Sequence, residues 1–198
     1  MAVSPQGNLS VSSSGATYTY RTSGGGTIVI DLKNGTISLT HDDDATFKIE
    51  FWGDFPDVKN TVHHENFKGK HIKDREGSRR SVAFPDGAKI TMVTNSESDL
   101  LLSISIYDGK ESHHINATCG QLEHSSVDAV KAEELDEAEA DGETAAIEKT
   151  NTGWMYVNVY QEATPGTKVH KRVNLAEGFF DSPNKVSDYY DDPRWGHT

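Results

Sequence analysis

Apolar and polar residues alternate along several short stretches of this chain, with the period of a half-buried β-strand. In residues 100–107, Leu102, Ile104 and Ile106 share one face, while the serines between them share the other. Residues 46–51 alternate in the same way. These stretches predict strands that bury one face against a core and turn the other toward solvent.

Several predicted strands come in pairs that flank a short turn. Residues 27–32 and 36–40 flank Asn34-Gly35, and similar pairs flank Pro85-Asp86-Gly87 and Asp108-Gly109. Asn-Gly and Asp-Gly favour the type I′ hairpin turn, in which both central residues have a positive φ. With a later pair joined through Pro165-Gly166, the chain has about ten predicted strands, enough for a sandwich or an open barrel. We predict an all-β fold built as an antiparallel meander.

One segment, at about residues 125–142, departs from this pattern because Ala and Glu dominate it. Ser125 is followed three residues later by Asp128, as in a capping box, and Gly142 can close a helix. The apolar stripe is thin, so such a helix would lie on the surface. We predict one short acidic surface helix, with an acidic linker as the alternative.

The composition changes along the chain and indicates three parts. Residues 1–16 are rich in Ser and Gly and are predicted to be a flexible leader. Residues 17–178 are predicted to form a single β domain. Residues 179–198 are rich in aromatic residues and turn formers, and we expect them to pack on that domain as a coil.

Charge and hydropathy limit the classes of partner. The net charge is −12, which disfavours nucleic acid and anionic membranes. No apolar run reaches the roughly 18 residues of a membrane helix, so we predict a soluble chain without membrane insertion. Residues 125–143 hold eight acidic residues and one lysine, whereas residues 68–80 hold six basic and two acidic residues. These two segments are expected to be solvated surfaces that attract each other, with a phosphate or anion site in residues 68–80 as the alternative.

Candidate metal ligands occur in two acidic clusters. Asp42, Asp43 and Asp44 lie between two predicted strands, and Asp54 and Asp57 follow a strand that ends in aromatic residues. Several carboxylates in a tight loop are the oxygen ligands that Ca²⁺ prefers. The alternatives are a solvated turn for the first cluster and a plug at a strand end for the second.

Other reactive residues give weaker indications. His63-His64 and His113-His114 are adjacent pairs, and neighbours on a strand point to opposite faces, so each pair gives one ligand at most to a given site. Cys119 is the single cysteine, which excludes an internal disulfide, and it is expected to be a small buried hydrophobe. Hydrolase, P-loop and dinucleotide motifs are absent, so the sequence leaves open whether the chain is an enzyme.

A resemblance to a known family covers about residues 45–116. A strand runs into Trp52-Gly53-Asp54, and a later hairpin reads Val82-Ala-Phe-Pro-Asp-Gly-Ala-Lys-Ile-Thr91, followed by a long alternating strand and an Asp-Gly turn. This order resembles the metal-ion-inducible autocleavage domain of secreted bacterial effectors. The resemblance implies export, Ca²⁺ binding and cleavage after Asp54, whose carboxylate would attack its own carbonyl carbon and form a cyclic anhydride. Phe55 stands where the family has Pro, so the chain is either a self-cleaving domain or a non-cleaving relative.

Three hypotheses about function follow. The first is an exported Ca²⁺-binding β domain with ligands among the five aspartates above and Asp54 as the nucleophile of any self-cleavage. The second is a non-catalytic module that binds glycan or protein through exposed aromatic residues, namely Trp52, Trp154 and Trp195. The third is a small-molecule enzyme or carrier with His63 or His114 in a barrel cavity.

Overall fold

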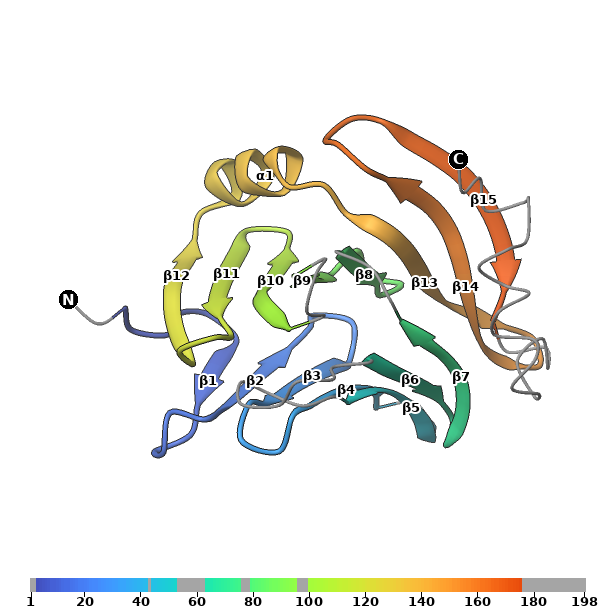
Figure 1. Cartoon of the computed structure of the whole chain (residues 1–198), viewed down its shortest axis with the longest axis horizontal. Coiled ribbons are helices and arrows are strands. Elements are labelled where there is room, and N and C mark those ends of the chain that lie inside the picture. The colour runs from blue at the N-terminus through green and yellow to red at the C-terminus, as the bar shows by residue number, and fades with distance from the viewer. Residues whose placement is uncertain (1–2, 43, 53–62, 76–78, 96–99, 176–198) are drawn as a thin grey trace.

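The computed structural model describes residues 3–42, 44–52, 63–75, 79–95 and 100–175. Within them, the strands form two open sheets that lie across from each other, and one short helix covers an end of the second sheet (Figure 1). The predicted mostly β fold with one short helix is confirmed. Both sheets are open in the part of the chain that the structure describes.

The first sheet has seven described strands that pair in chain order, each antiparallel to the next. This is the meander that the hairpin signals predict. The strands are β1 (Leu9–Val11), β2 (Thr17–Arg21), β3 (Gly26–Asp31), β4 (Thr36–His41), β5 (Asp44–Trp52), β6 (His63–Phe67) and β7 (Lys70–Arg75).

The second sheet has eight described strands in the order β12-β11-β10-β9-β8-β13-β14-β15. They are β8 (Arg79–Ala83), β9 (Lys89–Thr94), β10 (Leu101–Asp108), β11 (Glu111–Asn116), β12 (Gln121–Val127), β13 (Gly142–Thr150), β14 (Gly153–Glu162) and β15 (Lys168–Asn174). β8 and β13 are parallel, unlike a pure meander. A parallel pair needs a long crossover, and the chain supplies it through β9–β12 and the helix α1 (Ala129–Ala138).

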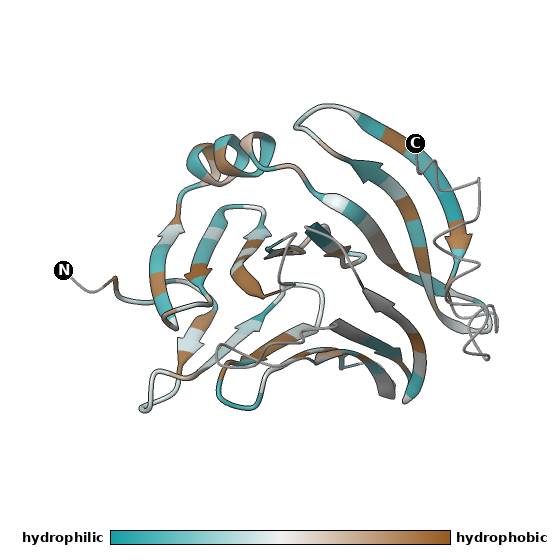
Figure 2. Cartoon of the chain, viewed as in Figure 1, coloured by the Kyte–Doolittle hydropathy of each residue, from teal (hydrophilic) through white to brown (hydrophobic). Residues whose placement is uncertain are grey.

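Apolar side chains from both sheets form one hydrophobic core. Ile28 and Leu39 of the first sheet and Ile90 and Ile104 of the second are fully buried in it. Apolar residues recur along the strands of both sheets (Figure 2). The predicted inward face of β10 is correct for Ile104 and Ile106, but a register shift between Leu101 and Ser103 buries Leu101 in place of Leu102.

The predicted hairpins form, but the predicted type I′ turns do not. Gly35, Gly87 and Gly109 have positive φ values of 65°, 91° and 57°, whereas the residues before them, Asn34, Asp86 and Asp108, do not, so no Asn-Gly or Asp-Gly pair has both residues in the left-handed region. The carboxylate of Asp31 accepts hydrogen bonds from the backbone N–H groups of Lys33 and Asn34, each at 3.1 Å. This local side-chain cap stabilises a longer turn that keeps Asn34 out of the left-handed region.

The helix begins later than predicted. Asp128 is the N-cap, and its carboxylate accepts the N–H of Lys131 at 3.1 Å. Ser125, predicted as the cap, lies within β12, where it pairs with His113. Only Ala132 of the helix is buried, so α1 is the predicted surface helix and the linker alternative is wrong.

The N-terminal segment is part of the first sheet. Residues 9–11 of the predicted flexible leader form β1, with Leu9 buried in the core. The predicted tail, residues 179–198, lies outside the described residues. In the part of the chain that the structure describes, no helix has the length and apolar character needed to cross a membrane.

Candidate functional site

A polar pocket of about 370 Å³ opens between the end of α1 and the hairpin of β14 and β15. Its volume lies in the lower part of the range of about 300–1,000 Å³ that small-molecule sites occupy. Five acidic and two basic residues line it, so its walls are predominantly negative. The lining residues are Lys89, Asp136, Glu137, Glu139, Asp141, Glu162, Pro165, Gly166 and Lys168.

Backbone geometry fixes the acidic wall of this pocket. The chain leaves α1 at Glu139, which is extended, and enters β13 at Gly142. Gly142 has φ 68°, and a Cβ there would lie 2.5 Å from the carbonyl oxygen of Arg79 on the adjacent strand β8. Glycine is therefore required where β13 meets β8, and this close contact holds the preceding residue, Asp141, against the sheet.

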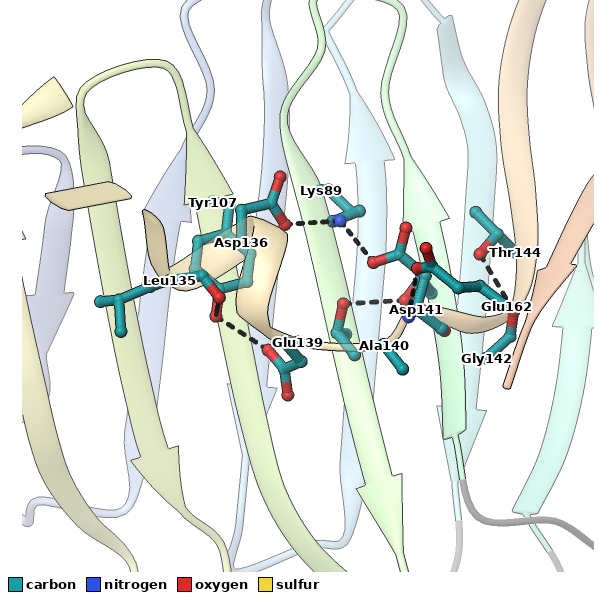
Figure 3. A network of polar contacts seen from close by, with 12 residues as sticks. Lys89, Tyr107, Leu135, Asp136, Glu139, Ala140, Asp141, Gly142, Thr144 and Glu162 are labelled. Carbon is teal, nitrogen blue, oxygen red and sulfur yellow. Dashed lines mark hydrogen bonds and ion pairs between the residues drawn. The ribbon is translucent and has the colours of Figure 1, made fainter. Parts of the chain in front are cut away.

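A buried lysine lies at the wall of the pocket between two carboxylates (Figure 3). Lys89 is 9% exposed; its Nζ lies 2.5 Å from Asp136 Oδ1 and also contacts Asp141 Oδ1. Burial acts to lower the pKa of the Lys89 ammonium, but the hydrogen bonds and charges of the two aspartates outweigh burial and raise that pKa above its usual value. Lys89 therefore stays protonated and acts as a fixed cation.

Asp141 connects this lysine to the hairpin side of the pocket. It is 1% exposed, and its Oδ2 accepts the hydroxyl of Tyr160 at 2.6 Å and lies 3.6 Å from Lys168 Nζ. Glu162 holds both sides together, because its carboxylate accepts the backbone N–H of Asp141 at 3.0 Å and that of Gly166 at 2.8 Å. Burial and the adjacent Asp141 raise the pKa of Tyr160, so its phenol stays a hydrogen-bond donor.

Two hydrogen bonds to Glu139 anchor the side of the pocket that lies next to α1. Tyr107 of β10 donates its hydroxyl to Glu139 at 2.8 Å, and the guanidinium of Arg79 donates to the other carboxylate oxygen of Glu139 at 3.2 Å. Burial and the charge of Glu139 raise the pKa of Tyr107. Residues 68–80 and 125–143 thus meet through Arg79 and Glu139, in agreement with the expected attraction between these oppositely charged segments.

A second polar network lies in the interior between the two sheets. Arg80 of β8 is 3% exposed and donates to Glu65 of β6 at 2.6 Å, to Tyr156 at 2.9 Å and to Asn158 at 2.6 Å. Glu65, Tyr156 and Asn158 are each 0% exposed. Because Glu65 belongs to the first sheet and the other residues to the second, this ion pair ties the sheets together.

A third network holds the N-terminal segment. His113 of β11 lies 2.9 Å from Ser125 Oγ through Nδ1 and 3.1 Å from Glu111 Oε2 through Nε2. The N–H of Gln6 donates to Ser125 Oγ at 2.8 Å, and Asn8 donates to Glu111 from its backbone and its side chain. Although Ser, His and Glu are the residue types of a hydrolase, this serine is buried and already hydrogen-bonded. The network is a structural clamp.

Acidification is expected to weaken this clamp. Burial lowers the pKa of His113 below the usual value of about 6.5. Its contribution to stability is complete above about pH 6.5 and is lost as the pH falls toward the folded-state pKa, with a slope of at most about 1.4 kcal/mol per pH unit. Urea unfolding between pH 7.5 and pH 5.5 checks this. His113→Asn should show a shallower pH dependence and the exposed control His170→Asn the wild-type dependence; equal slopes in all three proteins would contradict it.

The structure describes only part of the predicted calcium ligands. Asp43, Asp54 and Asp57 lie outside the described residues, Asp42 is exposed after β4, and Asp44 lies 4.0 Å from Lys68 in an ion pair. Among the described residues, no group of three or more His, Cys, Asp or Glu side chains is arranged to hold a metal ion. Calcium binding by these aspartates stays a prediction.

Asp44 and Trp52 are the two ends of one strand. β5 runs for nine residues between them but, because of a bulge after Asp44, it pairs with only six residues of β4, which span about 17 Å at the rise of a β-strand. One cation therefore cannot lie beside both ends. Any calcium bound at Asp44 and any bound next to Trp52 would occupy separate sites.

Two expectations about single residues are wrong, and the one about the pair His113 and His114 is correct. Trp154, proposed as an exposed aromatic, is buried with its ring 4.5 Å from that of His41. Cys119, expected to be buried, is an exposed thiol. His113 and His114 do point to opposite faces, and His114 contacts Ser105 rather than the pocket. Of the other proposed aromatics, Trp195 and the side chain of Trp52 lie outside the description.

The pocket residues were not among the predicted site residues. The signal for Asp136, Glu139 and Asp141 was the acidic segment itself, but nothing local to Lys89 indicates that it meets Asp141, 52 positions along the chain. Comparison of the chain with protein-family models, with curated proteins and with solved structures finds no match. A function can therefore be inferred only from the chemistry of the chain itself.

Proposed function

We propose that this chain is a non-catalytic binding domain whose pocket beside α1 takes up a small polar ligand. The observation that carries the proposal is the buried Lys89–Asp141 ion pair in the wall of an open pocket. A buried ion pair is often no more stabilising than apolar residues of the same size. Charged groups placed in a cleft are therefore candidates for recognition.

The protonation states of the surrounding groups favour binding over catalysis. A nucleophilic lysine needs a lowered pKa, but that of Lys89 is raised. The raised pKa values of Tyr107 and Tyr160 keep both phenols protonated, so neither supplies a general base near neutral pH. These groups act as fixed donors and cations, while the carboxylates act as acceptors.

A panel of small ligands tests the proposal. Because acidic residues predominate in the lining, neutral or cationic compounds should raise the melting temperature and organic anions should not. The panel consists of glucose, galactose, 1,5-diaminopentane and succinate at millimolar concentration, measured by thermal shift and calorimetry. A variant with Glu137→Gln should respond less, and the control Glu133→Gln on the same helix should respond like wild type. No response to any compound, or a response to succinate alone, would contradict the proposal.

A second candidate is the exported calcium-binding domain, with or without self-cleavage. It is supported by the order of elements: β5 ends at Trp52, β8 and β9 flank Pro85-Asp86-Gly87, and the long strand β10 leads to the Asp108-Gly109 turn. Thermal-shift measurement of the chain in EDTA and then in millimolar CaCl₂, followed by intact-mass measurement, tests this candidate. A raised melting temperature would support calcium binding, and two fragments that sum to the parent mass would establish cleavage. No change in either would contradict this candidate.

A further inference from the structure

We infer that the pocket beside α1 binds the ammonium group of a small organic amine, at the position that the side chain of Lys168 occupies. This inference rests on the proposed binding function and names the class of ligand. Two lysines of the chain already place their ammonium groups in this cavity, and they differ in how firmly they are held.

The lining of the pocket is suited to a cation. Glu139 accepts hydrogen bonds from Tyr107 and Arg79, and Glu162 accepts two backbone N–H groups. Glu137 projects from the exposed side of α1 into the lining, with no hydrogen bond to its carboxylate among the described residues. With five acidic residues against two lysines, the pocket keeps an excess of negative charge for a ligand to neutralise.

Both lysines show how an ammonium binds at this site. Lys89 Nζ contacts Asp136 and Asp141 and lies 5.7 Å from the centre of the Tyr107 ring. Lys168 Nζ lies 3.6 Å from Asp141 Oδ2 and 4.7 Å from the centre of the Tyr160 ring. A carboxylate together with an aromatic face is a combination that proteins use to bind organic ammonium ions.

The two ammonium positions differ in how firmly they are held. Lys89 is buried between two carboxylates. The side chain of Lys168 is 44% exposed, and its distance of 3.6 Å from Asp141 is long for a charge-assisted hydrogen bond. Lys168 is also the first residue of β15, which is the last strand in the sheet order. Because Lys168 is half-exposed and its contact with Asp141 is long, this ion pair is weaker than that of Lys89, and a ligand ammonium can take the place of Lys168.

Displacement would leave a complete site for the ligand. An incoming ammonium would meet Asp141 Oδ2 and the Tyr160 ring in place of Lys168, and Glu137 would be available to a second positive charge. A diamine matches the charge of the lining better than a monoamine does. Lys168 thus acts as an internal competitor of the ligand, and its removal should strengthen binding.

Calorimetric titration of the full chain with 1,5-diaminopentane at low ionic strength tests this inference, with 1,5-pentanediol as the neutral analogue. We expect the diamine and not the diol to bind, and Lys168→Ala to bind it about two- to fivefold more tightly. The matched control is Lys33→Ala, an exposed lysine in the turn after β3 that changes the net charge equally. Lys33→Ala should bind the diamine more tightly than wild type does, but by a smaller factor than Lys168→Ala.

Four results would overturn the inference. Equal affinity of Lys168→Ala and Lys33→Ala would show attraction to the acidic chain as a whole, and weaker binding by Lys168→Ala would contradict competition. Binding of glucose or galactose without binding of the diamine would reject the amine and leave the proposed function intact. Binding of no compound would reject both. A variant with Glu137→Gln, whose exposed site should tolerate the change, should bind the diamine more weakly than Glu133→Gln does.

Discussion

Replacement of Arg80 by Met is expected to lower the free energy of unfolding by about 3–5 kcal/mol. The guanidinium of Arg80 donates at 2.6 Å to Glu65, which has no exposed surface. Without Arg80, a charged carboxylate would remain in the interior, where it must lose its hydration or be protonated. Urea unfolding monitored by tryptophan fluorescence and circular dichroism measures the loss.

Two further variants separate the buried charge from the loss of packing. The double variant Arg80→Met with Glu65→Met should be more stable than Arg80→Met alone, because it also removes the buried charged carboxylate that Arg80 no longer neutralises. Arg172→Met is the exposed control: Arg172 forms a bidentate pair with Glu148 at 2.8 and 2.5 Å, and its loss should cost about 0–1 kcal/mol. If the double variant were no more stable than Arg80→Met, the assigned role of the buried charge would be wrong.

Replacement of Lys89 by Met is expected to lower the free energy of unfolding by about 3 kcal/mol. It also removes one of the two positive charges that line the pocket. Asp141 is almost fully buried, and Lys89 is one of the two cations beside it. Because breaking a buried pair leaves an incompletely compensated charge, the cost exceeds that of an ordinary surface substitution. Thermal and urea unfolding check the stability, and the diamine titration checks the pocket.

The contribution of Asp141 can be isolated in the same experiment. Adding Asp141→Asn to Lys89→Met should recover part of the stability, because the amide carries no charge. Lys110→Met, at an exposed position beside the Asp108-Gly109 turn, should stay within about 0.5 kcal/mol of wild type. A Lys89→Met variant as stable as Lys110→Met would contradict the assigned ion pair.

The parts of the fold that depend on local sequence could be predicted. Alternation places Ile104 and Ile106 in the core, and short turns place β3 beside β4 and β10 beside β11. Errors arise where a neighbour in space changes the local preference. Ser125 has the sequence of a helix cap, but its hydroxyl bonds His113 across the sheet, so the strand continues and Asp128 takes the cap.

The candidate site could not be predicted, because Lys89 meets Asp141 only through the parallel pairing of β8 with β13. That pairing places Arg80 opposite Glu143 and brings the acidic end of α1 to the start of β9, where Lys89 lies. No periodicity specifies such a crossover. The charge difference between residues 68–80 and 125–143 indicated attraction, but it did not show that Lys89 and Lys168, outside both segments, complete the pocket.

The most direct test of the binding pocket is a nuclear magnetic resonance titration of the ¹⁵N-labelled chain with 1,5-diaminopentane. Binding in the pocket should give saturable shift changes that are largest at the backbone amides of Asp141, Gly166 and Lys168, since these line the pocket. Changes confined to the turn at Asp42 and Asp44, changes spread evenly over the acidic surface, or no change at all would contradict it.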